Sequence, residues 1–122
     1  LQKVIAAISA EGQLKAQLAA DETDVALIEE GRRLLLSGQT KCTDCHQFRK
    51  RDEEASAPDL TGYGSRKWLI NFIGNPSHEN FYGERNDRMP AFGHEQILSA
   101  QAIGLIGDWL RGTWYEPAAA NR

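Results

Sequence analysis

Residues 42–46 read Cys-Thr-Asp-Cys-His, and this stretch decides what kind of fold the chain can form. Cys42 and Cys45 are three positions apart, and His46 follows the second cysteine directly. This order is the attachment motif of a c-type haem. One turn of chain can bring both thiols to the two vinyl groups of a porphyrin, while the adjacent imidazole lies under the ring. Because the chain contains only these two cysteines, the motif predicts one covalently attached haem c.

Two other chemistries also use paired cysteines. A thioredoxin-like redox dithiol expects a strand before the motif and a βαβ context, and the sequence shows neither. A zinc site needs further ligands, and His78 and His94 have no paired spacing with each other. A redox thiol and a metal site therefore remain as the alternatives to haem.

The length of 122 residues fits one domain. So short a chain has little core to bury, so a large apolar cofactor would provide a centre for it. Its hydrophobic content of 41% and charged content of 25% are ordinary for a soluble globular protein. The formal net charge of −3 gives no indication of nucleic-acid binding. No run of residues approaches the roughly 18 apolar positions of a membrane span.

The chain starts at Leu1, without a methionine or a signal-like region. We therefore expect a processed protein or a piece of a longer one. The machinery that attaches haem c in bacteria works outside the cytoplasm. We accordingly expect a periplasmic or otherwise extracytoplasmic location, either soluble or tethered to a membrane.

Hydrophobic spacing predicts an all-α chain with no convincing strand. A first helical segment runs to Ala20 and carries an apolar stripe of Leu1, Val4, Ile5 and Ile8. A second helix starts after Asp21–Asp24 and closes at Ser37-Gly38, with Ile28, Gly31 and Leu35 on one face. The polar residues 48–57 are expected to form a surface loop.

The second half predicts two more helices. Ser65 is expected to cap a short helix that Asn75-Pro76 ends. Residues 77–93 form a long irregular loop, of a length that is usually functional in so small a domain. Ser99 is expected to cap the last helix, which Gly112 and Pro117 end. One side of that helix carries Ala102, Ile103, Ile106, Trp109 and Leu110.

Residues 24–112 resemble a class I cytochrome c, with its motifs in the correct order. Residues 30–35 resemble the family's first helix with its close-packing glycine, although Leu35 stands where an aromatic is usual. Residues 57–60 resemble the proline motif, residues 88–90 the distal methionine loop, and residues 109–110 the aromatic–leucine pair of the last helix. The short spacing from His46 to Met89 is that of compact bacterial members. Residues 60–68 and 86–93 also resemble cytochrome c domains fused to quinol-oxidising bc-type membrane complexes.

The resemblance implies an all-α cytochrome c fold, with several helices around one haem and with the first and last helices crossing. Gly31 is then expected to let the last helix approach near Trp109. Residues 21–122 would be the cytochrome c domain, and residues 1–20 an N-terminal helical extension that the haem core does not need. The apolar stripe of this extension would rest on the domain's own surface, or the extension would be a stalk to a membrane-bound neighbour.

The same resemblance implies the iron ligands. His46 would bind iron through Nε2, and the backbone carbonyl of Pro58 would accept the hydrogen bond from its Nδ1. Met89 is the only methionine, and its thioether would be the distal ligand, which raises the potential relative to two histidines. Pro90 restricts Met89 to extended backbone. His78 and His94 are the rival distal ligands.

Other polar groups have weaker signals. Tyr63, Arg66, Trp68 and Asn71 are candidates for contacts with the haem propionates; packing for Trp68 and solvent for Arg66 are the alternatives. A basic group near the motif could steer an acidic redox partner, or could simply belong to a solvated loop of mixed charge. This group consists of Lys41, Arg49, Lys50 and Arg51.

We therefore expect an electron carrier that relays single electrons between redox proteins, among them a membrane-bound quinol-oxidising complex or a terminal oxidase. Two protein ligands on the iron leave no place for substrate, so an enzyme is not expected, except as one domain of a larger oxidoreductase. The alternative is a ligand-binding or catalytic haem domain in which Met89 dissociates.

Overall fold

The computed structural model describes residues 1–113, and the segment that contains Pro117 and the expected domain end lies outside them. The described residues hold five α-helices and no strand, so the all-α prediction is confirmed. The helices are α1 (Gln2–Glu11), α2 (Leu18–Thr23), α3 (Val25–Leu36), α4 (Arg66–Gly74) and α5 (Ala100–Leu110). Two short 3-10 turns, η1 (Cys42–Asp44) and η2 (Gly83–Arg85), interrupt the connecting segments. None of the described helices is long and apolar enough to cross a membrane.

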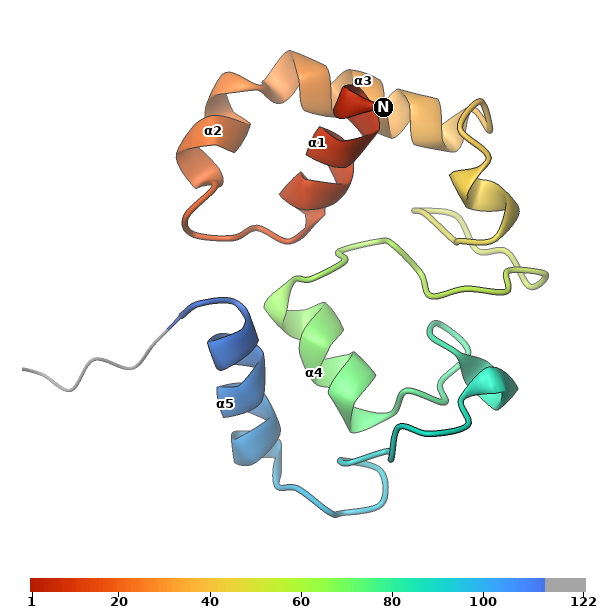
Figure 1. Ribbon diagram of the computed structural model, residues 1–122, viewed down its shortest axis with the longest axis vertical. Coiled ribbons are helices and arrows are strands. Elements are labelled where there is room, and N and C mark those ends of the chain that lie inside the picture. Colours follow the sequence, from red (N-terminus) through yellow and green to blue (C-terminus); the bar gives the residue numbers. More distant parts are fainter. Residues whose placement is uncertain (114–122) are drawn as a thin grey trace, which may run out of the picture.

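The helices form two groups (Figure 1). In the first, α1 packs along α3, and the short α2 closes the turn between them. In the second, α4 packs on α5. The connection between the groups is the segment that contains the Cys-Thr-Asp-Cys-His motif and the loop after it. The motif is thus placed beside the first group, at the end of α3.

Gly31 does not meet the helix that the family resemblance predicts. A Cβ at this position would fall on the backbone carbonyl of Lys3 and lie 2.8 Å from Cβ of Ala7. Gly31 therefore lets α1, rather than the last helix near Trp109, approach α3 closely. Between Leu1 and Thr113, no contact joins α3 to α5. The expected crossing is absent there because α1 occupies the glycine face of α3.

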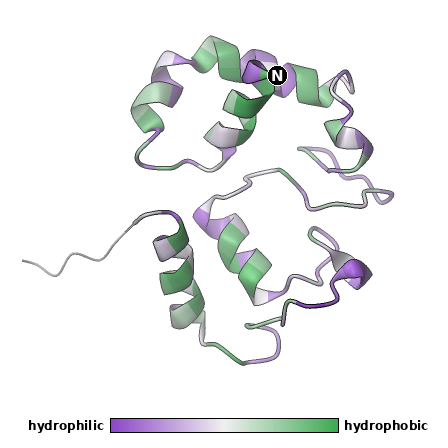
Figure 2. Cartoon of the chain, viewed as in Figure 1, coloured by the Kyte–Doolittle hydropathy of each residue, from purple (hydrophilic) through white to green (hydrophobic). Residues whose placement is uncertain are grey.

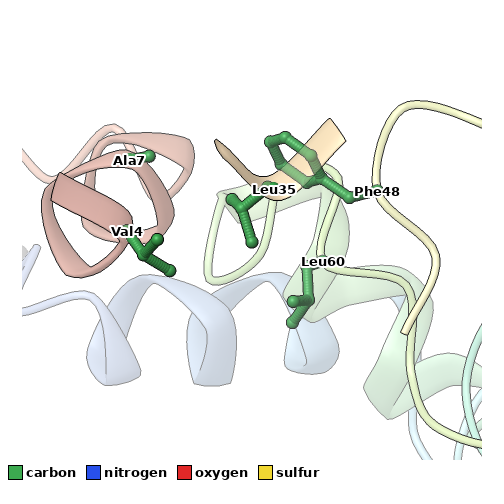
Figure 3. Close-up of a cluster of buried hydrophobic side chains, with 5 residues drawn as sticks. All are labelled: Val4, Ala7, Leu35, Phe48 and Leu60. Carbon is green, nitrogen blue, oxygen red and sulfur yellow. The ribbon is translucent and has the colours of Figure 1, made fainter. Parts of the chain in front are cut away.

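The buried cluster draws on three parts of the chain (Figure 3). Val4 and Ala7 come from α1, Leu35 comes from α3, and Phe48 and Leu60 come from the loop after the motif. The N-terminal stripe is thus divided between core and solvent, since Val4 is buried while Leu1 and Ile5 are exposed. The segment that the sequence suggests as an extension thus contributes α1 to the chain's own core, where it packs along α3.

The second group begins both of its helices as predicted. The Ser65 hydroxyl accepts the Trp68 N–H over 3.2 Å, and the Ser99 hydroxyl accepts the Ala102 N–H over 3.1 Å. These caps satisfy backbone donors that would otherwise lack a partner.

The apolar side of α5 is only partly covered. Ile103 is buried, but Trp109 is 58% exposed, and Leu110 is exposed as well. Figure 2 shows how apolar this helix is overall. The predicted stripe is only partly buried because α3, the helix expected to cover it, packs on α1 instead.

Candidate functional site

The motif folds as one tight turn at the end of α3. The Cys45 N–H and the His46 N–H both donate to the Cys42 carbonyl oxygen, over 3.3 Å and 3.0 Å. Lys41 enters the turn in the left-handed region, with φ 54°. Both thiols are free; Cys42 is half-buried and Cys45 is exposed. The turn thus places two cysteine side chains next to an imidazole.

His46 is oriented by the segment of Pro58. Its Nδ1 lies 2.7 Å from the Pro58 carbonyl oxygen. A carbonyl oxygen can only accept, so Nδ1 carries a proton, and in the neutral ring the lone pair is then on Nε2. In residues 1–113, no hydrogen bond reaches Nε2. This contact therefore selects the tautomer in which Nε2 can bind a metal.

Backbone hydrogen bonds also join the segment of His46 to the segment of Pro58. The N–H groups of Ser56 and Ala57 donate to the Cys45 carbonyl, over 3.0 Å and 2.9 Å. The Leu60 N–H donates to the Gln47 carbonyl over 2.9 Å. Residues 45–47 and 56–60 are thus joined side by side, which fixes the Pro58 carbonyl opposite the imidazole.

Phe48 lies in the segment that is predicted to be a surface loop, but it is 2% exposed and belongs to the core cluster. The loop prediction holds for the charged positions 49–54, all of which are exposed. The boundary was wrong by one aromatic residue, because a single apolar side chain beside a run of charges has no periodicity to reveal it.

A buried carboxylate is hydrogen-bonded to residues next to these two segments. The side chain of Glu11, at the end of α1, is 4% exposed, and it accepts hydrogen bonds from Arg49 (2.5 Å), Arg32 (3.3 Å) and the Gly62 N–H (2.8 Å). Buried charges need such partners. Glu11 therefore links α1 to α3 through Arg32, and to the segments before and after residues 50–60 through Arg49 and Gly62. A lone glutamate in a helix gave no sequence signal for this role.

The long loop of residues 77–93 contains Met89. Its side chain is half-buried, and its backbone is hydrogen-bonded to the side chain of Asn86. In the part of the chain that the structure describes, no hydrogen bond joins Met89 to the motif or to His46. The structure thus brings together the two cysteines, His46 and Pro58, while Met89 belongs to a separate loop.

The expected propionate contacts have partners within the protein. Trp68 Nε1 donates to the Asp59 carbonyl over 2.8 Å, and the Tyr63 ring packs edge-on against the Trp68 ring at 4.9 Å. Arg66 forms a two-point ion pair with Asp108, over 2.7 Å and 3.2 Å. This pairing raises the pKa of Arg66 and lowers that of Asp108. For Arg66 and Trp68, the structure thus shows roles in packing and pairing.

The rival histidines line a different hollow from that of His46. His78 and His94 line a cavity of about 590 Å³ between α4, α5 and the loop of residues 77–93, together with Phe81 and Ile103. His46 lines a separate cavity of about 450 Å³, together with Leu36, Thr43 and Phe48. Among residues 1–113, no three His, Cys, Asp or Glu side chains gather as a metal site. A haem iron does not need such a cluster, because it takes only its axial ligands from the protein.

No protein-family model, curated protein or solved structure matches the chain. Its function therefore has to be inferred from the motif and from the contacts around His46.

Proposed function

We propose that the chain is a cytochrome c domain that carries single electrons. Cys42 and Cys45 would hold one haem c through thioether bonds, and His46 and Met89 would be the axial ligands. The observation that carries this proposal is the 2.7 Å contact between His46 Nδ1 and the Pro58 carbonyl. It prepares Nε2 to bind a metal within one turn of the two thiols.

The donor set suits a haem c. Both thiols are free, so neither is already used in a disulfide. Nδ1 of His46 donates to the Pro58 carbonyl, which leaves Nε2 of the neutral ring available to iron. The chain's only methionine offers a thioether, which favours the ferrous state. When bound, the haem supplies an iron that takes up and releases one electron.

The arrangement of the thiols does not favour a redox dithiol. Reactive cysteine pairs of that kind sit in a βαβ context, whereas the described chain has no strand and places Cys42 on a 3-10 turn. Two protein ligands on the iron would leave no position for substrate. We therefore propose an electron carrier, either free or as one domain of a larger oxidoreductase.

The partners would be redox proteins outside the cytoplasm, with a quinol-oxidising complex or a terminal oxidase as the candidates. The basic group near the motif is smaller than the sequence suggested, because Arg49 pairs with Glu11 and Arg51 lies 3.5 Å from Glu79. Lys41 and Lys50 are exposed. These two lysines are the charges left to steer an acidic partner.

The test is production of the chain together with a haem c maturation system. We expect a Soret band and haem that stays on the denatured chain during acid–acetone extraction. The matched controls are Cys42→Ala and Cys45→Ala, each of which leaves one thioether site, and the double variant, which should retain none.

Release of all haem from the parent chain would refute the assignment. Absence of haem together with a reversible Cys42–Cys45 disulfide would favour the redox dithiol. Fast carbon monoxide binding by the reduced parent would favour a ligand-binding haem domain.

A further inference from the structure

Asn86 holds Met89 by a pair of hydrogen bonds that uses both polar groups of the methionine backbone. Its Nδ2 donates to the Met89 carbonyl oxygen over 2.8 Å, and its Oδ1 accepts from the Met89 N–H over 3.2 Å. Because one backbone group is an acceptor and the other a donor, only one orientation of the amide satisfies both. The side chain therefore fixes the direction of this peptide segment as well as its position.

The same amide connects the loop to a packed helix. The second hydrogen of Nδ2 is donated to Ser77 Oγ over 2.8 Å. Ser77 follows α4 closely, and its own N–H donates to Oδ1 of Asn75, the residue that ends α4, over 3.2 Å. Met89 is thereby tied, through two side chains, to the end of α4.

The rest of the loop offers Met89 little support. Asp87 and Arg88 pair at 3.6 Å with side chains that are 79% and 90% exposed, and such surface pairs contribute little. Pro90 has no N–H to donate. Within the described residues, Asn86 supplies every hydrogen bond that reaches the Met89 backbone. The hydrogen bonding of the Met89 backbone thus depends on one amide.

We propose that Asn86 is a positioning residue that keeps the Met89 thioether presented to the iron. This inference rests on the proposed function, in which Met89 is the distal ligand. Without the amide, the loop would exchange between a closed form and open forms in which the thioether is withdrawn. An external ligand reaches the iron only in the open forms, so its rate of binding reports their population.

The test compares holoprotein variants in carbon monoxide binding to the ferrous form and in amide hydrogen exchange at the Met89 N–H. For Asn86→Ala we expect haem to stay attached and the ferric far-red sulfur-to-iron band to weaken. Both rates should rise about tenfold, because one decade corresponds to about 1.4 kcal/mol, near the net worth of one or two hydrogen bonds. Asp87→Ala, in the same loop but without a bond to Met89, is the matched control and should behave as the parent.

Two further variants keep the test decisive if Asn86→Ala does not fold. Asn86→Asp keeps an acceptor for the Met89 N–H but loses the donor to its carbonyl, so both rates should rise by a smaller factor. Ser77→Ala removes only the connection to α4 and should also give a smaller rise. Rates within about twofold of the parent in the foldable Asn86 variants would overturn the inference.

Met89→Ala separates the two levels of the proposal. If it abolishes the far-red band and opens the iron to carbon monoxide while the Asn86 variants behave as the parent, Met89 remains the ligand and only the role of Asn86 is refuted. If Met89→Ala leaves the band and the binding rate unchanged, the axial assignment fails, and the inference about Asn86 fails with it.

Discussion

Gly31→Ala should lower the free energy of unfolding by about 1–3 kcal/mol, although alanine is the better helix former by roughly 1 kcal/mol. The added methyl would fall on the Lys3 carbonyl oxygen and lie 2.8 Å from Cβ of Ala7. The carbonyl belongs to the backbone of α1, so no change of rotamer can relieve the clash. The helix α1 must move away from α3.

The magnitude follows from what that movement uncovers. Val4 and Ala7 are buried against the same cluster, and complete burial of a valine side chain is worth about 1.5–3 kcal/mol. Partial loss of this burial, together with overpacking strain of about 1–3 kcal/mol, outweighs the gain in helix propensity. Gly31→Val should cost more, because its branched side chain is larger.

Urea denaturation of the holoprotein, followed by circular dichroism, measures the effect. The matched control is Gly107→Ala on α5. The nearest atoms to a Cβ at this position are 3.7 Å and 4.0 Å away, on Ile70 and Leu69. That variant should therefore be as stable as the parent or slightly more so. A Gly31→Ala protein at least as stable as the parent would refute the close approach of α1 to α3.

Met89→Ala should leave haem attached but lower the reduction potential, because the thioether that favours ferrous iron is lost; redox titration against the parent measures it, and an unchanged potential would argue against ligation. The hydrogen bond and charge of Arg33 lower the pKa of Glu30 from 4.5 to about 2, so the stabilisation that this pair contributes is present above pH 4.5 and is lost as the pH falls toward 2. A carboxyl titration by NMR should show Glu30 returning toward its ordinary pKa in Arg33→Gln, and an unshifted value in that variant would contradict the pairing. Deletion of residues 1–20 should leave the motif able to hold haem, but the loss of stability should be substantial, since the deletion removes two members of the core cluster and the carboxylate of Glu11. Parent-like urea stability of the truncated holoprotein would show that the core does not need α1.

Local signals in the sequence predicted α3, α4 and α5 with their starts, but not the break after Glu11 that separates α1 from the short α2. The caps at Ser65 and Ser99 were predicted because a cap depends on a side chain and a backbone N–H three residues away. The contact between His46 and Pro58 was expected only through the family resemblance, because its partners are 12 positions apart. No local pattern encodes a contact over that distance.

The contacts of Glu11 and Asn86 were not predicted from the sequence, for two different reasons. Glu11 pairs with Arg49 and with the Gly62 N–H across 38 and 51 positions, so its burial depends on how the segments assemble. Asn86 is only three positions from Met89. Here a signal existed, since asparagine readily hydrogen-bonds nearby backbone in a turn.

The sequence by itself determined the helical class, the turn with two thiols and an imidazole, and the long loop that carries the only methionine. Each of these depends on residue spacing along a short stretch, where backbone geometry alone sets which side chains are neighbours. Only the tertiary structure decided that α1 rather than α5 fills the face of Gly31, that Phe48 enters the core, and that a carboxylate from α1 supports the segment facing His46. These features depend on competition between distant segments for the same buried surface, and the outcome is set by packing and charge pairing in three dimensions.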